Sequence, residues 1–218
     1  MIKIISYDLD GTLIKMDFAN TFWFQVVPEV YAKKYGMAFD EAKKRVVSEY
    51  DKIGPSDLRW YDPVWWFKYF KLDFPVESAI QEAISRGTMQ LFDDALPSLK
   101  MARSCADAVI VTTLQPHIFL KYTSVLIKDY VDAIWSTTSD VGRPLKDAET
   151  FKAIAAQYNA KMNMIAHVGD NIENDYLLPR KAGVHAFLLD RTKRQNGEHF
   201  VGDLIEFVRK VQYLEVKL

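Results

Sequence analysis

The chain of 218 residues carries 28 Lys and Arg against 29 Asp and Glu, a formal net charge of −1, and 49% of its residues are hydrophobic. This composition supports a full hydrophobic core, excludes a disordered chain, and gives no sign of a nucleic-acid or membrane surface. The lone Cys105 excludes an intramolecular disulfide and a multi-cysteine metal site, as is typical of a reducing compartment.

No apolar run approaches the ~18 residues that a membrane span needs, and no cleavable signal pattern opens the chain. We therefore expect a cytoplasmic protein whose partner is a small molecule and neither a nucleic acid nor a membrane. The oligomeric state is left open, because no sequence pattern bears on it.

The apolar, β-branched run at residues 2–7 predicts a first strand, and Asp8-Leu9-Asp10-Gly11-Thr12 follows it directly. Strand residues alternate between faces, so we expect Asp8 and Asp10 to point the same way. Gly11 allows the backbone to turn tightly beside them. Two neighbouring carboxylates need a cation or a proton between them.

Residues 16–87 are rich in aromatic residues and helix formers and show no strand pattern. They predict an all-helical insertion of about four helices. The expected breaks are Pro28, Gly36, Gly54-Pro55, Pro63 and Pro75. We assign residues 16–89 to this helical unit and residues 1–15 and 90–218 to the core, with hinges at residues 14–17 and 86–92.

From Ala106 onward, short apolar runs alternate with helical patterns. The expected strands are residues 108–112, 131–135, 164–168 and 184–189, and the expected helices are residues 115–128, 147–158, 174–182 and 203–214. Right-handed crossovers between them predict an α/β fold, a doubly wound, mostly parallel, Rossmann-like sheet. Ligands of such sheets bind beyond the carboxyl ends of the strands.

Polar residues follow the predicted strands at that edge. They are Asp8 and Asp10 after the first strand, Thr112 and Thr113 at the second, Asp170 and Asp175 after the fourth, and Arg143 and Lys146 ahead of a helix. Carboxylates without His or Cys ligands favour Mg²⁺ over Zn²⁺. A bound Mg²⁺ would offset their repulsion and neutralise an incoming phosphate.

These segments, in this order, resemble the four motifs of the haloacid dehalogenase (HAD) superfamily. The motifs are Asp8-Leu-Asp-Gly-Thr-Leu, Val109-Ile-Val-Thr112-Thr, a lysine near 146, and Gly169-Asp170 with Asp175. The resemblance covers the predicted sheet from Ile2 to about Arg191. The helical insertion resembles the cap of the first class of this superfamily, which would close over the site and set specificity.

The resemblance implies that Asp8 is a nucleophile that forms an aspartyl-phosphate and ligates Mg²⁺. Asp10 would be the general acid and then the base, with its backbone carbonyl on the metal. Asp170 would ligate Mg²⁺, and Asp175 would orient a metal-bound water or the cation of the third motif. That cation would balance charge at the phosphate; we prefer Lys146 over Arg143 because Asp147 would cap the following helix.

Thr112 would hydrogen-bond the phosphoryl oxygens, with Thr113 as the alternative and Gly11 as a further phosphate contact. The carboxylate at Asp10 favours hydrolysis of a small phosphomonoester, since a halide needs no proton. A phosphomutase, a receiver-type domain and a non-catalytic phospho-ligand binding protein remain alternatives. No catalytic role is assigned to His117, His167, His185 or His199, and the tryptophans of the insertion are expected in its core.

Overall fold

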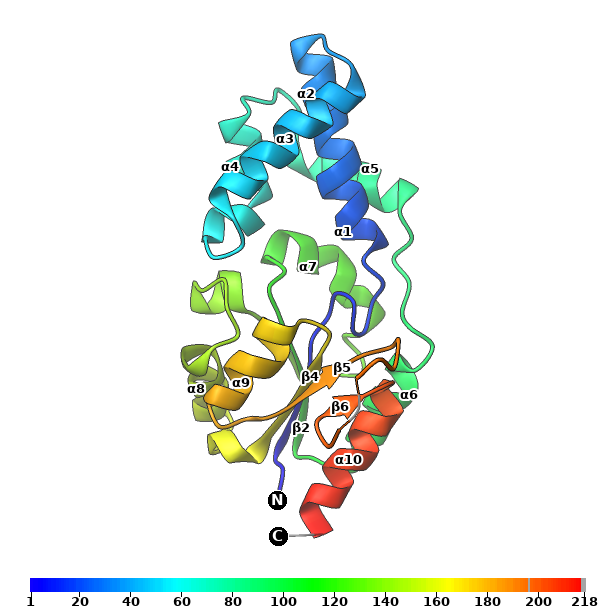
Figure 1. The fold of residues 1–218 in the computed structure, drawn as a ribbon, viewed down its shortest axis with the longest axis vertical. Helices are drawn as coiled ribbons and strands as arrows, with labels where there is room; N and C mark the ends of the chain where they lie inside the picture. The colour runs from blue at the N-terminus through cyan, green and yellow to red at the C-terminus, as the bar shows by residue number, and fades with distance from the viewer. Residues whose placement is uncertain (196, 217–218) are drawn as a thin grey trace. The chain divides into compact units, whose positions relative to one another are not determined.

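The computed structural model describes residues 1–195 and 197–216 of the chain (Figure 1). The chain divides into two compact units, one formed by Met1–Ile14 with Leu91–Leu218 and the other by Lys15–Gln90. We call them the core unit and the helical unit. None of the helices in the described part of the chain is long and apolar enough to cross a bilayer.

The core unit contains a six-stranded sheet in the order β3-β2-β1-β4-β5-β6, and every neighbouring pair is parallel. The strands are β1 (Ile4–Tyr7), β2 (Ala108–Thr113), β3 (Ala133–Ser136), β4 (Ile165–Gly169), β5 (His185–Leu189) and β6 (Phe200–Val201). The doubly wound, Rossmann-like prediction is confirmed. The strand order reverses at β1, so the carboxyl end of β1 lies at the switch point of the sheet, where such folds bind ligands.

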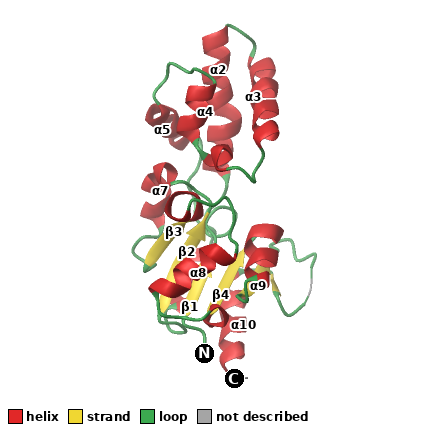
Figure 2. Ribbon diagram, turned by 90° about the vertical axis from the view of Figure 1, so that its left-hand side faces the viewer, coloured by secondary structure: helices red, strands yellow, loops and turns green. Residues whose placement is uncertain are grey.

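Helices cover both faces of this sheet (Figure 2). They are α6 (Ala95–Ala102), α7 (His117–Thr123), α8 (Ala148–Gln157), α9 (Leu178–Lys181) and α10 (Leu204–Val216). Ile5 and Tyr7 of β1 pack with residues of α6 and α10, whereas Ile4 packs with Phe151 of α8. Alternation along β1 therefore places Ser6 and Asp8 on the α8 face.

Burial on both faces explains why the strand sequences are almost continuously apolar. All four residues of β1 are buried, and Tyr7 lies edge-on to Phe207 with their ring centroids 5.4 Å apart. Ser6 is the polar member of this strand and is fully buried. A buried hydroxyl costs free energy unless it is hydrogen-bonded, and its partners belong to the network beneath the site.

In the helical unit, α1 (Asp17–Thr21), a π-helical turn (Phe22–Val26) and α2 (Val27–Tyr35) follow one another without a break. The unit also contains α3 (Phe39–Ile53), a 3₁₀ turn (Leu58–Tyr61), α4 (Pro63–Tyr69) and α5 (Val76–Arg86). Aromatic rings fill its interior, with Tyr50, Trp66 and Phe70 in mutual contact. Trp66 is fully buried, whereas Trp23, Trp60 and Trp65 are half-buried.

The predicted break at Pro28 is wrong. Pro28 lies two residues beyond the π-helical turn, in which the Val27 amide donates to the Phe22 carbonyl, and the shifted hydrogen bonds of this turn let the helix continue although Pro28 has no amide hydrogen. Gly36 does end α2, in the left-handed conformation with φ 63°. The sequence interpretation also omitted α6 and the short strand β6, and it made the helix after β2 too long.

The two chain segments that enter and leave the helical unit run antiparallel to each other. In the core unit Ile14 bridges Leu91, and the Phe92 amide donates to the Leu13 carbonyl at 3.0 Å. In the helical unit the Lys15 amide donates to the Gln90 carbonyl at 2.9 Å. Backbone pairing thus holds the segments at the two ends of the insertion next to each other in space.

Candidate active site

Asp8 lies directly beyond the last residue of β1. Its amide donates to the Val168 carbonyl at 2.8 Å, which continues the β1–β4 pairing by one residue. The β1–β2 register pairs Tyr7 with Val111, so Asp8 comes level with Thr112. Asp8 is 7% exposed and is therefore buried at the carboxyl edge of the sheet.

A tight turn follows Asp8, and the Asp170 carboxylate lies close to the glycine of this turn, Gly11. The Leu9 carbonyl accepts from the amides of Leu13 and Ile14, and the Gly11 amide donates to the Ile14 carbonyl. Gly11 has φ 80°, and a Cβ at this position would lie 2.5 Å from Asp170 Oδ2. The glycine therefore permits both the turn and the close approach of the Asp170 carboxylate.

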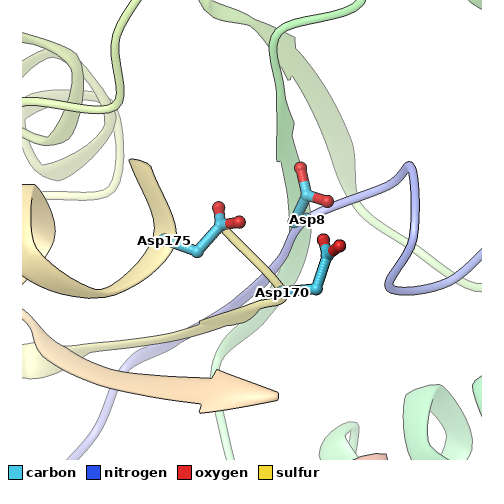
Figure 3. Close-up of side chains that lie close together, drawn as sticks. All are labelled: Asp8, Asp170 and Asp175. Carbon is cyan, nitrogen blue, oxygen red and sulfur yellow. The ribbon is translucent and has the colours of Figure 1, made fainter. Parts of the chain in front are cut away.

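Three carboxylates meet at this edge, from Asp8, Asp170 and Asp175 (Figure 3). One oxygen from each lies within 4.8 Å of the others. Asp170 follows β4 directly, and Asp175 lies in the π-helical turn Ile172–Leu177. A Cβ on Gly169 would lie 2.3 Å from Asp175 Cγ, so this second glycine is what allows Asp175 to pack against the strand end.

Lys146 provides the buried cation of the cluster. Its ammonium donates to Asp8 Oδ1 and to Asp175 Oδ1, and its side chain is 1% exposed. The Asp147 carboxylate caps α8 by accepting from the Glu149 amide at 3.1 Å. Arg143, the alternative cation, pairs instead with Asp147 at a half-exposed position. Lys146 is thus the one of these two cations that reaches the Asp8 carboxylate.

The pKa values of the cluster reflect a shortage of positive charge. Burial would lower the pKa of Lys146, but Asp175 and Asp8 raise it above its usual range. Burial opposes ionisation of Asp175, yet Lys146 and His167 hold its pKa below the ordinary value. The pKa of Asp8 is raised well above normal, by burial and by the charges of Asp175 and Asp170, against the pull of Lys146. One ammonium does not compensate three carboxylates.

The donor set fits a hard divalent cation. Both oxygens of Asp175 already accept hydrogen bonds, Oδ1 from Lys146 and His167 and Oδ2 from the Asn171 amide. Asp8 and Asp170 use Oδ1 for their contacts with Lys146 and Thr12. Oδ2 of Asp8 and Oδ2 of Asp170 are therefore the oxygens best disposed to ligate a cation, and Asp175 is better suited to orient its neighbours.

Asp10 has a different environment from Asp8, two residues before it. The side-chain amide of Gln115 donates to Asp10 Oδ1 at 2.7 Å. Asp10 does not belong to the three-carboxylate cluster found among the described residues. Burial raises the pKa of Asp10 to about 6, against the lowering effects of the Gln115 hydrogen bond and Lys146. A carboxyl with this pKa can both donate and accept a proton near neutral pH.

The two threonines of β2 are both buried and both have protein partners. The Thr112 hydroxyl lies 2.9 Å from Ser6 Oγ, and Thr113 Oγ1 accepts from the Gln115 amide at 3.1 Å. Thr112, which lies level with Asp8, would have to turn its hydroxyl hydrogen away from Ser6 to meet a phosphoryl oxygen. The Gly11 amide already donates to the Ile14 carbonyl. Gly11 therefore leaves room for the Asp170 carboxylate, and its amide is not a free donor for a ligand.

The sequence interpretation missed a buried polar chain beneath the cluster. His167 Nδ1 lies 2.9 Å from Ser6 Oγ, and His167 Nε2 lies 3.1 Å from Asp175 Oδ1. Burial lowers the pKa of His167, which keeps the ring neutral. Nε2–H then donates to Asp175, Ser6 donates to Nδ1, and Thr112 donates to Ser6. The available signal was a Ser and a His within otherwise apolar strands.

Replacing Gly11 with alanine tests whether the Asp170 carboxylate requires a residue without a Cβ at position 11. Gly36 is the matched control, because it has a similar positive φ of 63° but nothing within 4 Å of the point that a Cβ would occupy. Both alanine variants should lose about 1 kcal/mol of unfolding free energy to backbone strain. Gly11→Ala should lose a further ~1–3 kcal/mol by overpacking, measured by urea unfolding. Equal losses would contradict the crowding at Asp170.

Replacing Lys146 with methionine removes the counterion of two buried carboxylates. We expect a loss of about 3–5 kcal/mol in unfolding free energy, against less than about 1 kcal/mol for Lys152→Met. Lys152 is the control because its side chain is 63% exposed and pairs only with exposed Glu149 in the described structure.

The loss for Lys146→Met should depend on pH. Without the ammonium, the pKa values of Asp8 and Asp175 rise, and an acid with a raised folded-state pKa is relieved by protonation as the pH falls. The difference from wild type should therefore be larger at about pH 8 than at about pH 5. A difference that stays constant over this range would contradict the role of Lys146 as a buried counterion.

Comparisons with known proteins bear on this site. Residues 2–183 match the family model described as haloacid dehalogenase-like hydrolase. The GMP/IMP nucleotidase YrfG of Escherichia coli strain K12 is 24% identical over 172 residues, which make up 78% of this chain and 75% of YrfG.

Solved structures share the fold. A HAD phosphatase from Thermococcus onnurineus superposes with a TM-score of 0.80 at 23% identity, over 97% of this chain and 98% of that one. A 2-haloacid dehalogenase from Pseudomonas syringae pv. Tomato DC3000 gives a TM-score of 0.68 at 16% identity, over 98% and 100% of the two chains. With the family model matching most of its length, this chain belongs to the haloacid dehalogenase-like hydrolases.

Proposed function

We propose that this HAD hydrolase is a Mg²⁺-dependent phosphatase that cleaves a small phosphomonoester through an aspartyl-phosphate on Asp8. The observation that supports this most is the contrast between its two neighbouring acids. Asp8 lies with Lys146 and two further carboxylates, as suits a nucleophile held near a metal ion. Asp10 lies apart from them, hydrogen-bonded to Gln115, as suits a proton carrier.

Asp8 and Asp170 would hold the metal ion, together with the backbone carbonyl of Asp10. When bound, Mg²⁺ supplies positive charge that offsets the carboxylates and the incoming phosphate. Asp175 would keep Lys146 in place through the ion pair between them. Lys146 and the Thr112 hydroxyl would hydrogen-bond the oxygens of the phosphoryl group as it transfers, with Thr113 as the alternative to Thr112.

In the first step a carboxylate oxygen of Asp8 forms a bond to phosphorus, and the bond from phosphorus to the ester oxygen breaks. The electron pair of that bond goes to the ester oxygen, which takes the proton of Asp10 and leaves as an alcohol. In the second step ionised Asp10 takes a proton from a water molecule, and the oxygen of that water attacks phosphorus. The bond from phosphorus to Asp8 breaks, and inorganic phosphate is released.

The acid at position 10 distinguishes this reaction from dehalogenation, since an alkoxide leaving group needs a proton and a halide does not. The similarity to a nucleotidase places nucleoside monophosphates among the substrates to test first. We further propose that the helical unit serves as the cap that selects the substrate, with a small phosphorylated metabolite as the partner.

A panel of phosphorylated metabolites that includes GMP and IMP, assayed for free phosphate, tests this proposal. We expect turnover that stops when a chelator is added and returns with Mg²⁺. Asp8→Asn, which keeps the size of the side chain but removes its charge, should hydrolyse none of the esters while still unfolding in one cooperative transition in denaturant, as the wild type does. Hydrolysis by this variant would refute the nucleophile, and an isomerised ester in place of phosphate would indicate a mutase.

Asp10→Asn tests the proton carrier by separating the two steps. With an alkyl phosphate, kcat/KM should fall by about 10²–10⁴-fold, because the alkoxide must leave without a proton. With p-nitrophenyl phosphate the first step should persist, and slow hydrolysis of the aspartyl-phosphate should give a burst of about one nitrophenol per site. Unchanged kcat/KM for the alkyl ester would contradict the role of Asp10 as the acid.

A further inference from the structure

Gln115 lies in the loop between β2 and α7 and is the hydrogen-bond partner of Asp10. It is 6% exposed, and all four of its polar groups have partners. Its backbone amide donates to Thr113 Oγ1 at 3.1 Å, and its backbone carbonyl accepts from Ser136 Oγ at 2.7 Å. The backbone of this residue is therefore anchored to two strand ends, β2 and β3.

The side chain of Gln115 is held at its far end as well. Thr123 Oγ1, on the last turn of α7, donates to Gln115 Oε1 at 2.8 Å, while Gln115 Nε2 donates to Asp10 Oδ1 at 2.7 Å. The Thr123 hydroxyl is fully buried, and its other acceptor, the Phe119 carbonyl, is more distant at 3.3 Å. The bond from Thr123 to Oε1 therefore turns the NH2 end of the amide, and not its oxygen, toward Asp10.

The orientation has a chemical consequence for the carboxyl group. An amide N–H can only donate, so Asp10 Oδ1 must act as an acceptor in this contact. The carbonyl oxygen of a protonated carboxyl group is a better acceptor than its hydroxyl oxygen, so this contact favours the proton of Asp10 on Oδ2. If the amide were reversed, its carbonyl oxygen would face the carboxylate oxygen, two acceptors in contact, and this arrangement would be tolerated only while Asp10 is protonated.

We infer that Gln115 is a positioning residue that fixes the rotation of the Asp10 carboxyl group and favours its transferable proton on Oδ2. The inference rests on the proposed function, in which Asp10 protonates the leaving alcohol and later activates water. Gln115 itself does not touch the reacting atoms. It acts through Asp10, and Thr123 acts through Gln115.

Leaving-group dependence separates this role from a merely structural one. The ratio kcat/KM reports the steps up to release of the alcohol, and only a poor leaving group needs the proton of Asp10 in those steps. Loss of the positioning contact should therefore slow cleavage of an alkyl phosphate and spare p-nitrophenyl phosphate. A distorted nucleophile or metal site would slow both esters equally.

The experiment compares Gln115→Met with wild type on an alkyl phosphate and on p-nitrophenyl phosphate. Methionine keeps the length of the side chain but has no donor. We expect kcat/KM for the alkyl ester to fall by about 10²-fold, because a misplaced catalytic group costs this much, and mainly through kcat. For the nitrophenyl ester it should change by less than about 3-fold.

Thr123 provides a second, independent variant in case Gln115→Met does not fold. Thr123→Val removes the hydroxyl that holds the amide and should produce the same selective loss, whereas Thr123→Ser keeps the hydroxyl and should restore the wild-type ratio between the esters. Thr138→Val is the matched control. Its hydroxyl donates to the Leu114 carbonyl of the same loop at 3.1 Å but makes no described contact with Asp10 or Gln115.

The outcomes distinguish the inference from the proposed function. A selective loss in Gln115→Met or Thr123→Val, absent in Thr138→Val, supports the positioning role. Equal losses on both esters, or no loss, overturn it while the phosphatase proposal stands. If the wild-type protein hydrolyses neither ester and no member of the metabolite panel, the phosphatase proposal fails and the inference fails with it.

Discussion

A buried ammonium between two buried carboxylates is the constraint on which the site depends. Lys146 contacts Asp8 and Asp175, and all three side chains are at least nine-tenths buried. Removing these charges from water is costly, and it is tolerated only where partners surround each of them. His167 and the Asn171 amide complete the hydrogen bonds of Asp175. The position of Lys146 is thereby fixed from the sheet side, and its charge is directed at Asp8.

The same geometry gives Asp8 and Asp10 different surroundings, which suit the different tasks that we propose for them. Asp8 lies among other charges, so its protonation depends on the cations near it. Asp10 faces a neutral amide, and its pKa of about 6 results mainly from burial, with smaller effects from the Gln115 hydrogen bond, Lys146 and Asp170. A nucleophile must stay ionised and a proton carrier must change state, and divergent environments allow both within three residues. Asp10 and Gly11 both lie in the tight turn that is closed by the bonds of Leu13 and Ile14 to Leu9, and from this turn the Asp10 side chain meets Gln115 and not Lys146.

The sequence predicted the sheet and the meeting of Asp8, Asp170 and Asp175, because strand ends of a parallel sheet converge at one edge and their residues are adjacent in sequence to the strands. It could not predict Gln115 or His167. Gln115 reaches Asp10 through a loop whose path depends on Ser136 and Thr123, and His167 reads as an ordinary polar residue within an apolar strand. The helix break predicted at Pro28 is wrong because the helix continues through Pro28 after a π-helical turn. No residue pattern in the sequence predicts such a turn.

The side-chain contacts that link Asp8, Asp10, Lys146 and Asp175 at the carboxyl edge of the sheet are ion pairs and hydrogen bonds between charged and polar groups. In the proposed reaction Asp8, Asp170 and Lys146 would act on features common to all phosphomonoesters, and Asp10 with Gln115 would act on the ester oxygen, which all of them also share. None of these residues can distinguish one alcohol from another, because discrimination requires contacts with the part of the substrate that differs. In the proposed reaction, selectivity must therefore reside in residues that contact the alcohol part of the substrate.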